Sequence, residues 1–66
     1  MSVMKVIEIM SDSSESWEDA ASSGIKKASK SINDIKSAFV QSQSVTVKNG
    51  SIDKYRVNLK LSFEVK

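Results

Sequence analysis

Apolar and polar residues alternate without interruption over positions 55–66, at the C-terminal end of the chain. The apolar members are Tyr55, Val57, Leu59, Leu61, Phe63 and Val65. A period of two residues is typical of a β-strand with one buried and one polar face. Such a strand reaches roughly 40 Å, because each residue adds about 3.3 Å. A compact chain of 66 residues has a radius of gyration of only about 11 Å, so this strand is too long for the globule that one chain can form.

The N-terminal half predicts a strand followed by a helix. Positions 3–10 are rich in Val, Ile and Met, which favours a first strand. The Ser, Asp and Glu side chains of positions 11–16 are typical of a helix N-cap. An apolar stripe at steps of three and four then runs from Trp17 to Ile35, and Trp17 is expected to pack at the helix start rather than to stack on a ligand. We expect the helix to end near Asn33, a weak helix former.

A second long strand is predicted over positions 35–47, where Phe39 is expected to join the core. The alternation changes phase within positions 41–44, which indicates a bulge. Asn49-Gly50 then predicts a tight hairpin turn, because both residues tolerate positive φ. The whole chain, 1–66, is therefore read as a single α+β domain of order β-α-β-β, with a three-stranded antiparallel sheet curled around one helix.

The chain lacks the covalent and metal devices that stabilise most small domains. It contains no cysteine, no histidine and no proline, so neither a disulfide nor a common structural zinc site can form. A domain of this size buries only about 60% of the surface that its unfolded chain exposes. Association of several copies is the remaining way to complete the burial, and we expect a homo-oligomer.

The same composition narrows the classes of function. Without histidine or cysteine the chain has neither a general base for neutral pH nor a thiolate nucleophile, so an enzyme is not expected. The net charge of +2 is far below the basic field of a nucleic-acid-binding protein. The apolar run near the N-terminus is too short for a signal peptide or a membrane span. These features predict a cytoplasmic protein that binds neither nucleic acid nor membrane.

Acidic side chains near the predicted helix start are candidate metal ligands. Asp12, Glu15, Glu18 and Asp19 supply carboxylate oxygens of the kind that calcium prefers, and Glu64 on the last strand is a further candidate. Their spacing does not match an EF-hand loop. Helix capping and the helix dipole also explain the acids near the helix, so both interpretations stay open, with Asp12, Glu15 and Glu64 as the metal candidates.

Several short segments, taken in order, resemble the dodecin family. They are Met4-Lys5-Val6-Ile7-Glu8-Ile9, the helix opening from Ser13 to Trp17, Asp34-Ile35, and the segment from Lys54 to Phe63. The resemblance covers essentially the whole chain. It implies small strand-helix-strand-strand subunits that assemble as a hollow dodecamer, and in many members the storage of riboflavin or FMN as stacked flavin pairs.

Two positions depart from the pattern of flavin-binding dodecins. The resemblance puts Ser37 where those members carry a tryptophan that stacks on the flavin, and Arg56 where they carry a glutamine that hydrogen-bonds it. Serine has no aromatic face, and arginine has donors but no acceptor. The chain is more similar to a flavin-lacking subset that includes calcium dodecins, with which it shares the Ser16-Trp17-Glu18 opening and the arginine after the tyrosine.

The resemblance therefore implies an oligomer that binds or stores a small ligand, with Ser37 and Arg56 at a site between subunits. The ligand expected from these two changes is another small molecule or a cation such as calcium. Storage of a flavin cofactor, riboflavin or FMN, and a purely structural oligomer are the alternatives.

Overall fold

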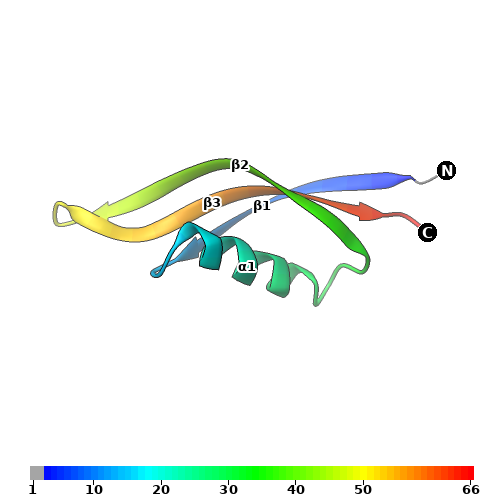
Figure 1. Ribbon diagram of the computed structural model, residues 1–66, viewed down its shortest axis with the longest axis horizontal. Coiled ribbons are helices and arrows are strands. Elements are labelled where there is room, and N and C mark those ends of the chain that lie inside the picture. Colours follow the sequence, from blue (N-terminus) through cyan, green and yellow to red (C-terminus); the bar gives the residue numbers. More distant parts are fainter. Residues whose placement is uncertain (1–2) are drawn as a thin grey trace.

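The computed structural model describes residues 3–66, which form one helix and three strands (Figure 1). In chain order the elements are β1 (Met4–Ser13), α1 (Trp17–Ala28), β2 (Ile35–Lys48) and β3 (Ser51–Glu64). β3 lies in the middle of the sheet and pairs antiparallel with β1 on one side and β2 on the other. The β-α-β-β order and the antiparallel sheet confirm the predicted α+β fold, and the alternating segment is the central strand.

The alternation in β3 determines which face of the sheet is buried. Val57, Leu59 and Leu61 lie beneath α1 and form the core together with Ala20 of the helix. Seven partly buried apolar residues surround this core: Ile7, Ile9, Trp17, Ala21, Ile25, Ala28 and Ile35. The opposite face, called the outer face below, carries four rows of side chains that cross all three strands. These rows are Asp12–Arg56–Ser44, Met10–Asn58–Ser42, Glu8–Lys60–Phe39 and Val6–Ser62–Ser37.

The sheet is much longer than the helix that covers it. The 12 residues of α1 span about 18 Å at 1.5 Å each, whereas the 14 residues of β2 or β3 reach roughly 46 Å. The molecule measures 50 × 20 × 14 Å, and its radius of gyration is 13.4 Å, above the value of about 11 Å for a compact chain of this length. The predicted overrun of the hairpin is confirmed, and both ends of the sheet extend beyond α1 (Figure 1).

The boundary between β1 and α1 differs from the prediction. β1 continues to Ser13 instead of ending near Met10, because its last residues pair with β3. The helix is capped by Ser16, whose Oγ accepts a hydrogen bond from the backbone N–H of Asp19 at 2.9 Å. The polar cluster at positions 11–16 therefore serves both the strand end and the helix cap.

The helix also ends earlier than predicted, at Ala28 rather than near Asn33. The hydroxyl of Ser29 donates to the carbonyl of Ile25 at 2.8 Å, which closes the last turn. Asp34 then adopts a left-handed backbone with φ of 62°, a conformation that cannot continue an α-helix. Ile35 consequently opens β2 instead of extending the helical stripe. Within residues 3–66 no helix has the length and apolar character needed to cross a membrane.

The pairing of β2 with β3 contains the expected bulge and corrects one core prediction. The register shifts between Val40 and Ser42, as the change of phase predicted, and two further shifts occur nearer the strand ends. Asn49 and Gly50 turn the chain with φ of 51° and 78°. Phe39 is 64% exposed, so its assignment to the core was wrong. It pairs with Lys60, and that pairing puts it on the outer face.

Gly24 allows α1 to approach β1 closely, which yields a first prediction. A Cβ at this position would lie 2.9 Å from the Cβ of Ser11 and 3.1 Å from its Oγ. We expect Gly24→Ala to lower the free energy of unfolding by about 1–3 kcal/mol through overpacking, offset by up to about 1 kcal/mol because alanine favours the helix. Urea unfolding followed by circular dichroism measures the change.

A double-variant cycle provides the control for Gly24→Ala. Ser11→Gly removes the Cβ that the alanine would meet, so Gly24→Ala should cost less in the Ser11→Gly background than in the wild type. Equal costs in the two backgrounds would contradict the close contact between α1 and β1.

Candidate functional site

An ion pair on the outer face joins Arg56, a predicted ligand-binding residue, to Asp12, a predicted metal ligand. Arg56 of β3 and Asp12 of β1 are direct cross-strand partners. The Nε of Arg56 donates to Oδ1 of Asp12 at 2.7 Å, and its second donor, Nη2, reaches Oδ2 at 3.2 Å. This two-point geometry is the strong form of an arginine–carboxylate contact. Both side chains remain about one-third exposed, so the pair can be reached from solvent or by another subunit.

The pair changes the titration of both groups. The hydrogen bond from Arg56 lowers the pKa of Asp12 below its usual value. The same contact raises the pKa of Arg56 above its usual value. The carboxyl pKa of Asp12 is lower in the folded chain than in the unfolded chain. The ion pair therefore stabilises the folded state at neutral pH, and this contribution is lost as the pH falls through the lowered pKa. At neutral pH the guanidinium therefore stays charged and remains held by Asp12.

Ser37 lies on the same face as Arg56 but at a different place along it. Its hydroxyl is hydrogen-bonded to the hydroxyl of Ser62, its partner on β3. Ser62 and Arg56 are six residues apart on one strand, which corresponds to roughly 20 Å. The fold thus brings the two predicted ligand residues to one face without bringing them into contact within a subunit.

The three predicted metal ligands are separated in the single subunit. Asp12 is near the end of β1 and is engaged by Arg56. Glu15 is exposed in the link between β1 and α1, whereas Glu64 pairs with Met4 at the opposite end of the sheet. Among residues 3–66 no three Asp, Glu, His or Cys side chains form a cluster that could hold a metal ion. The carboxylates in the described part of one subunit therefore do not form a calcium site by themselves.

A buried serine connects the end of β1 to α1, and its full role was not evident from the sequence. Ser13 is only 8% exposed. Its Oγ donates to Oδ2 of Asp19 at 2.6 Å and accepts a hydrogen bond from the backbone N–H of Glu15 at 2.9 Å. A spacing of six residues belongs to no capping motif, so only the structure reveals the contact between Ser13 and Asp19. The contact fixes the helix start relative to the strand that carries Asp12.

We expect Ser13→Ala to lower the free energy of unfolding by about 1–3 kcal/mol. The substitution leaves the N–H of Glu15 without its acceptor and Asp19 without its donor in a partly buried place. Thermal unfolding followed by circular dichroism measures the loss. Ser14→Ala is the matched control because Ser14 is the exposed neighbour; equal effects of the two substitutions would contradict the role of Ser13.

Trp17 links the helix start to the two long strands. Its indole Nε1 donates to the backbone carbonyl of Ser44 at 3.0 Å. Its ring meets Tyr55 edge to face, with centroids 5.1 Å apart and an angle of 76° between the planes. Trp17 thus packs at the helix start, as the sequence predicts, next to the strand segment that carries Arg56.

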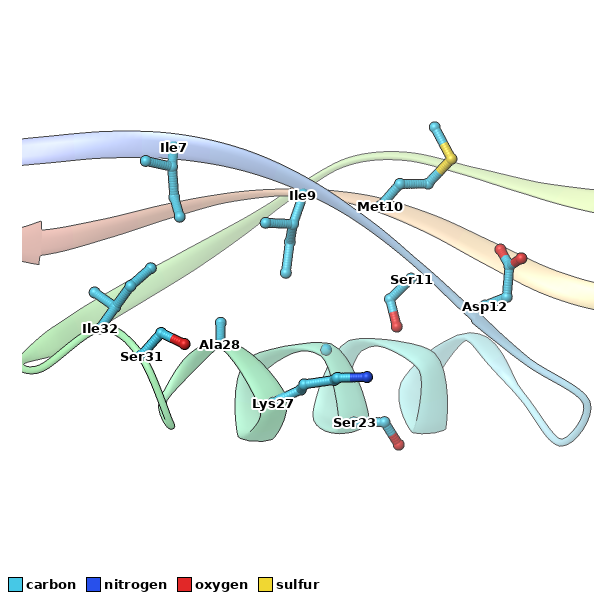
Figure 2. Close-up of a pocket in the computed structure, with 11 residues that line it drawn as sticks. Ile7, Ile9, Met10, Ser11, Asp12, Ser23, Lys27, Ala28, Ser31 and Ile32 are labelled. Carbon is cyan, nitrogen blue, oxygen red and sulfur yellow. The ribbon is translucent and has the colours of Figure 1, made fainter.

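An open groove of about 640 Å³ runs between β1 and α1. Figure 2 shows Ile7 and Ile9 pointing from β1 toward the helix and Ala28 pointing back toward the sheet. Asp12 is the only acidic residue of the lining, and its carboxylate points away from the helix (Figure 2). The groove is therefore mainly apolar inside, and a cation would find few ligands there.

Comparison with known proteins identifies the same family by sequence model and by curated relative. Residues 3–66 match the family described as Dodecin. A curated relative, "Calcium dodecin" of Mycobacterium tuberculosis, is 39% identical over 66 residues, which is 100% of this chain and 93% of that protein.

Solved structures show the same fold. The crystal structure of the M. tuberculosis calcium dodecin, described as a calcium-chelating antigen with a novel calcium-binding site, matches at 40% identity with a TM-score of 0.86, covering 97% of this chain and 91% of that one. The dodecin of Streptomyces coelicolor matches with a TM-score of 0.94 at 20% identity, over 98% and 93% of the two chains. An arginine-to-alanine variant of the Thermus thermophilus dodecin matches with a TM-score of 0.93 at 23% identity, over 100% and 98%.

Proposed function

Since the chain belongs to the dodecin family, we propose that it is a dodecameric container that binds a cation, with calcium as the ligand, rather than a flavin. The outer face supports an assembly, because Met4, Val6, Met10 and Phe39 leave large apolar side chains exposed on it. A sheet face with such side chains is typical of an interaction surface. No catalytic step is proposed.

The ion pair between Arg56 and Asp12 is the observation that carries the argument against flavin. A glutamine amide can both donate to and accept from the edge of a flavin ring, whereas Arg56 offers donors only, and two of those donors are already used by Asp12. Ser37 has its hydroxyl engaged with Ser62 and offers no aromatic surface. A flavin at this face would therefore lack both the stacking contact and the two-way hydrogen bond.

Calcium is proposed because the curated relative at 39% identity is a calcium dodecin. Calcium takes six to eight oxygen ligands, and among residues 3–66 of one subunit no three carboxylates come together. In a symmetric oligomer, however, a residue near a symmetry axis meets copies of itself, so that one carboxylate per subunit becomes two or three. We therefore propose that calcium is held between subunits.

The three candidate residues differ in how readily their carboxylates could bind calcium. Glu15 is exposed and Glu64 is half-buried near the end of the sheet, and neither takes part in an ion pair within residues 3–66. Asp12 is next to the positive charge of Arg56, which opposes a second cation at the same carboxylate. Glu15 and Glu64 are thus the first candidates to test by substitution, and Asp12 is the third.

The test is native mass spectrometry of freshly purified protein, with isothermal titration of chelator-treated protein with calcium. The expected result is an assembly of twelve subunits that takes up calcium, with weaker uptake in at least one of Glu15→Gln, Glu64→Gln and Asp12→Asn. Riboflavin fluorescence should remain unquenched at micromolar protein. Strong quenching would overturn the cation proposal in favour of flavin storage, and an intact dodecamer that takes up neither ligand would favour a purely structural oligomer.

A further inference from the structure

The groove between β1 and α1, called the β1–α1 groove below, has the size and shape of a small-molecule site. Its volume of about 640 Å³ lies within the range of about 300–1,000 Å³ that is typical of ligand pockets. The stretch of β1 that borders it runs from Ile7 to Asp12, a length of roughly 17 Å. An elongated small molecule therefore suits this groove better than a rounded one.

One half of the β1–α1 groove is apolar. Ile7 and Ile9 point from β1 toward the helix, while Ala28 and Ile32 line the groove opposite them (Figure 2). Ile7, Ile9 and Ala28 pack against the core but are only partly buried by it. An alkyl chain lying along these side chains would remove apolar surface of both partners from water, which is favourable.

The other half of the groove is polar and carries a positive charge. The side chain of Ser11 points from β1 toward α1, and the side chain of Lys27 extends along the helix toward the same half of the groove (Figure 2). Lys27 takes part in no ion pair within residues 3–66. Its ammonium group has three donors, and the hydroxyl of Ser11 has one. These two side chains can therefore donate to one carboxylate.

The acidic residue of the lining does not neutralise this charge. The carboxylate of Asp12 points away from the helix (Figure 2). Its two oxygens accept hydrogen bonds from Arg56 at 2.7 and 3.2 Å. The charge that faces the groove is therefore that of Lys27, and charge complementarity favours an anionic ligand over a cationic one.

We propose that the β1–α1 groove binds an amphipathic monocarboxylate such as a medium-chain fatty acid. The alkyl chain lies on Ile7, Ile9 and Ile32, and the carboxylate accepts from Lys27 and Ser11. A short carboxylate would leave the apolar half unfilled, whereas a cationic amphiphile would be repelled by Lys27. The site lies on the helix side of the sheet, opposite the outer face, so the inference does not depend on the proposed calcium binding.

Isothermal titration of the assembled wild-type protein with decanoate tests the proposal. The protein is treated with chelator beforehand so that calcium does not precipitate the carboxylate, and each amphiphile is kept below the concentration at which it forms micelles. The expected dissociation constant is roughly 0.1–1 mM, because small ligands gain only a modest free energy per atom. Decyltrimethylammonium has a chain of the same length with a positive head group, and it should bind at least about 5-fold more weakly.

Two substitutions, each with a matched control, locate the ligand in the groove. Lys27→Gln should weaken decanoate binding about 3- to 10-fold, whereas Lys26→Gln should change it less than about 2-fold, because Lys26 is the exposed helical neighbour that does not line the groove. Ile32→Ala should also weaken it about 3- to 10-fold by removing apolar contact. Its control is Ile52→Ala, since Ile52 is an exposed isoleucine outside the groove. Circular dichroism checks that each variant is folded.

Three results would overturn the inference. The first is a wild-type protein that binds decanoate with a dissociation constant above about 10 mM. The second is equal affinity for decanoate and decyltrimethylammonium, which would indicate apolar adsorption without recognition of charge. The third is an equal effect of Lys26→Gln and Lys27→Gln on decanoate binding. None of these results bears on calcium, because calcium uptake is measured separately in the absence of decanoate.

Discussion

Leu59→Ala is expected to lower the free energy of unfolding by about 2–5 kcal/mol, the usual cost of truncating a buried leucine. Leu59 is 0% exposed in the central strand, beneath the helix. Only four apolar residues are buried to this degree among those that the structure describes. A loss of this size is a large part of the total stability of about 5–15 kcal/mol that is typical of folded domains, so the variant should unfold at a clearly lower urea concentration than the wild type.

Urea unfolding followed by circular dichroism, at several protein concentrations, measures this effect and separates subunit folding from assembly. Lys60→Ala is the control, because Lys60 is the next residue of the same strand and faces the opposite side of the sheet. It should change the free energy of unfolding by no more than about 0.5 kcal/mol. Similar losses in the two variants would mean that the buried face of β3 is not the core of the subunit.

The part of the fold that could be predicted follows from local patterns. The alternation over residues 55–65 identifies the central strand, because a period of two residues directly determines which side chains share a face. Asn49-Gly50 fixes the turn for a similarly local reason, since two successive residues with positive φ need these residue types. Ala20 was not predicted as core, although it is 0% exposed. Alanine carries little apolar signal, and its burial follows from how the helix is oriented over β3.

The candidate site depends on register, which no local pattern provides. Arg56 meets Asp12 only because β1 pairs with β3 in one particular register, and a shift by one residue would send Asp12 to the other face. The acidic cluster could be seen in the sequence, but its partner lies 44 residues away. The exposure of Phe39 also depends on register. Shifts in the pairing of β2 with β3 on both sides of Phe39 place it opposite Lys60, on the outer face. Long-range pairing thus decides which polar groups meet.

Introducing the tryptophan and the glutamine of the flavin-binding pattern at positions 37 and 56 should give this chain affinity for riboflavin. In Ser37→Trp combined with Arg56→Gln, the tryptophan offers an aromatic face, and the glutamine amide can both donate and accept. Stacking on an aromatic side chain contributes about 1–3 kcal/mol per ring, which corresponds to roughly a 5- to 150-fold gain in affinity. Both side chains project from the outer face, so neither substitution disturbs the buried core. Titration of riboflavin fluorescence measures the gain against the wild type, for which no quenching is expected at micromolar protein.

The matched control for the gained tryptophan is Ala38→Trp combined with Arg56→Gln. Ala38 is the next residue of β2 and pairs with the buried Leu61, so its side chain faces the opposite side of the sheet from Ser37. The control variant should quench riboflavin no more than Arg56→Gln alone does. Quenching by both tryptophan variants would mean that the indole acts without a defined site. An assembled Ser37→Trp/Arg56→Gln protein without quenching would show that Ser37 and Arg56 do not form a flavin-sized site between subunits, and the case against flavin in the wild type would then rest on other residues.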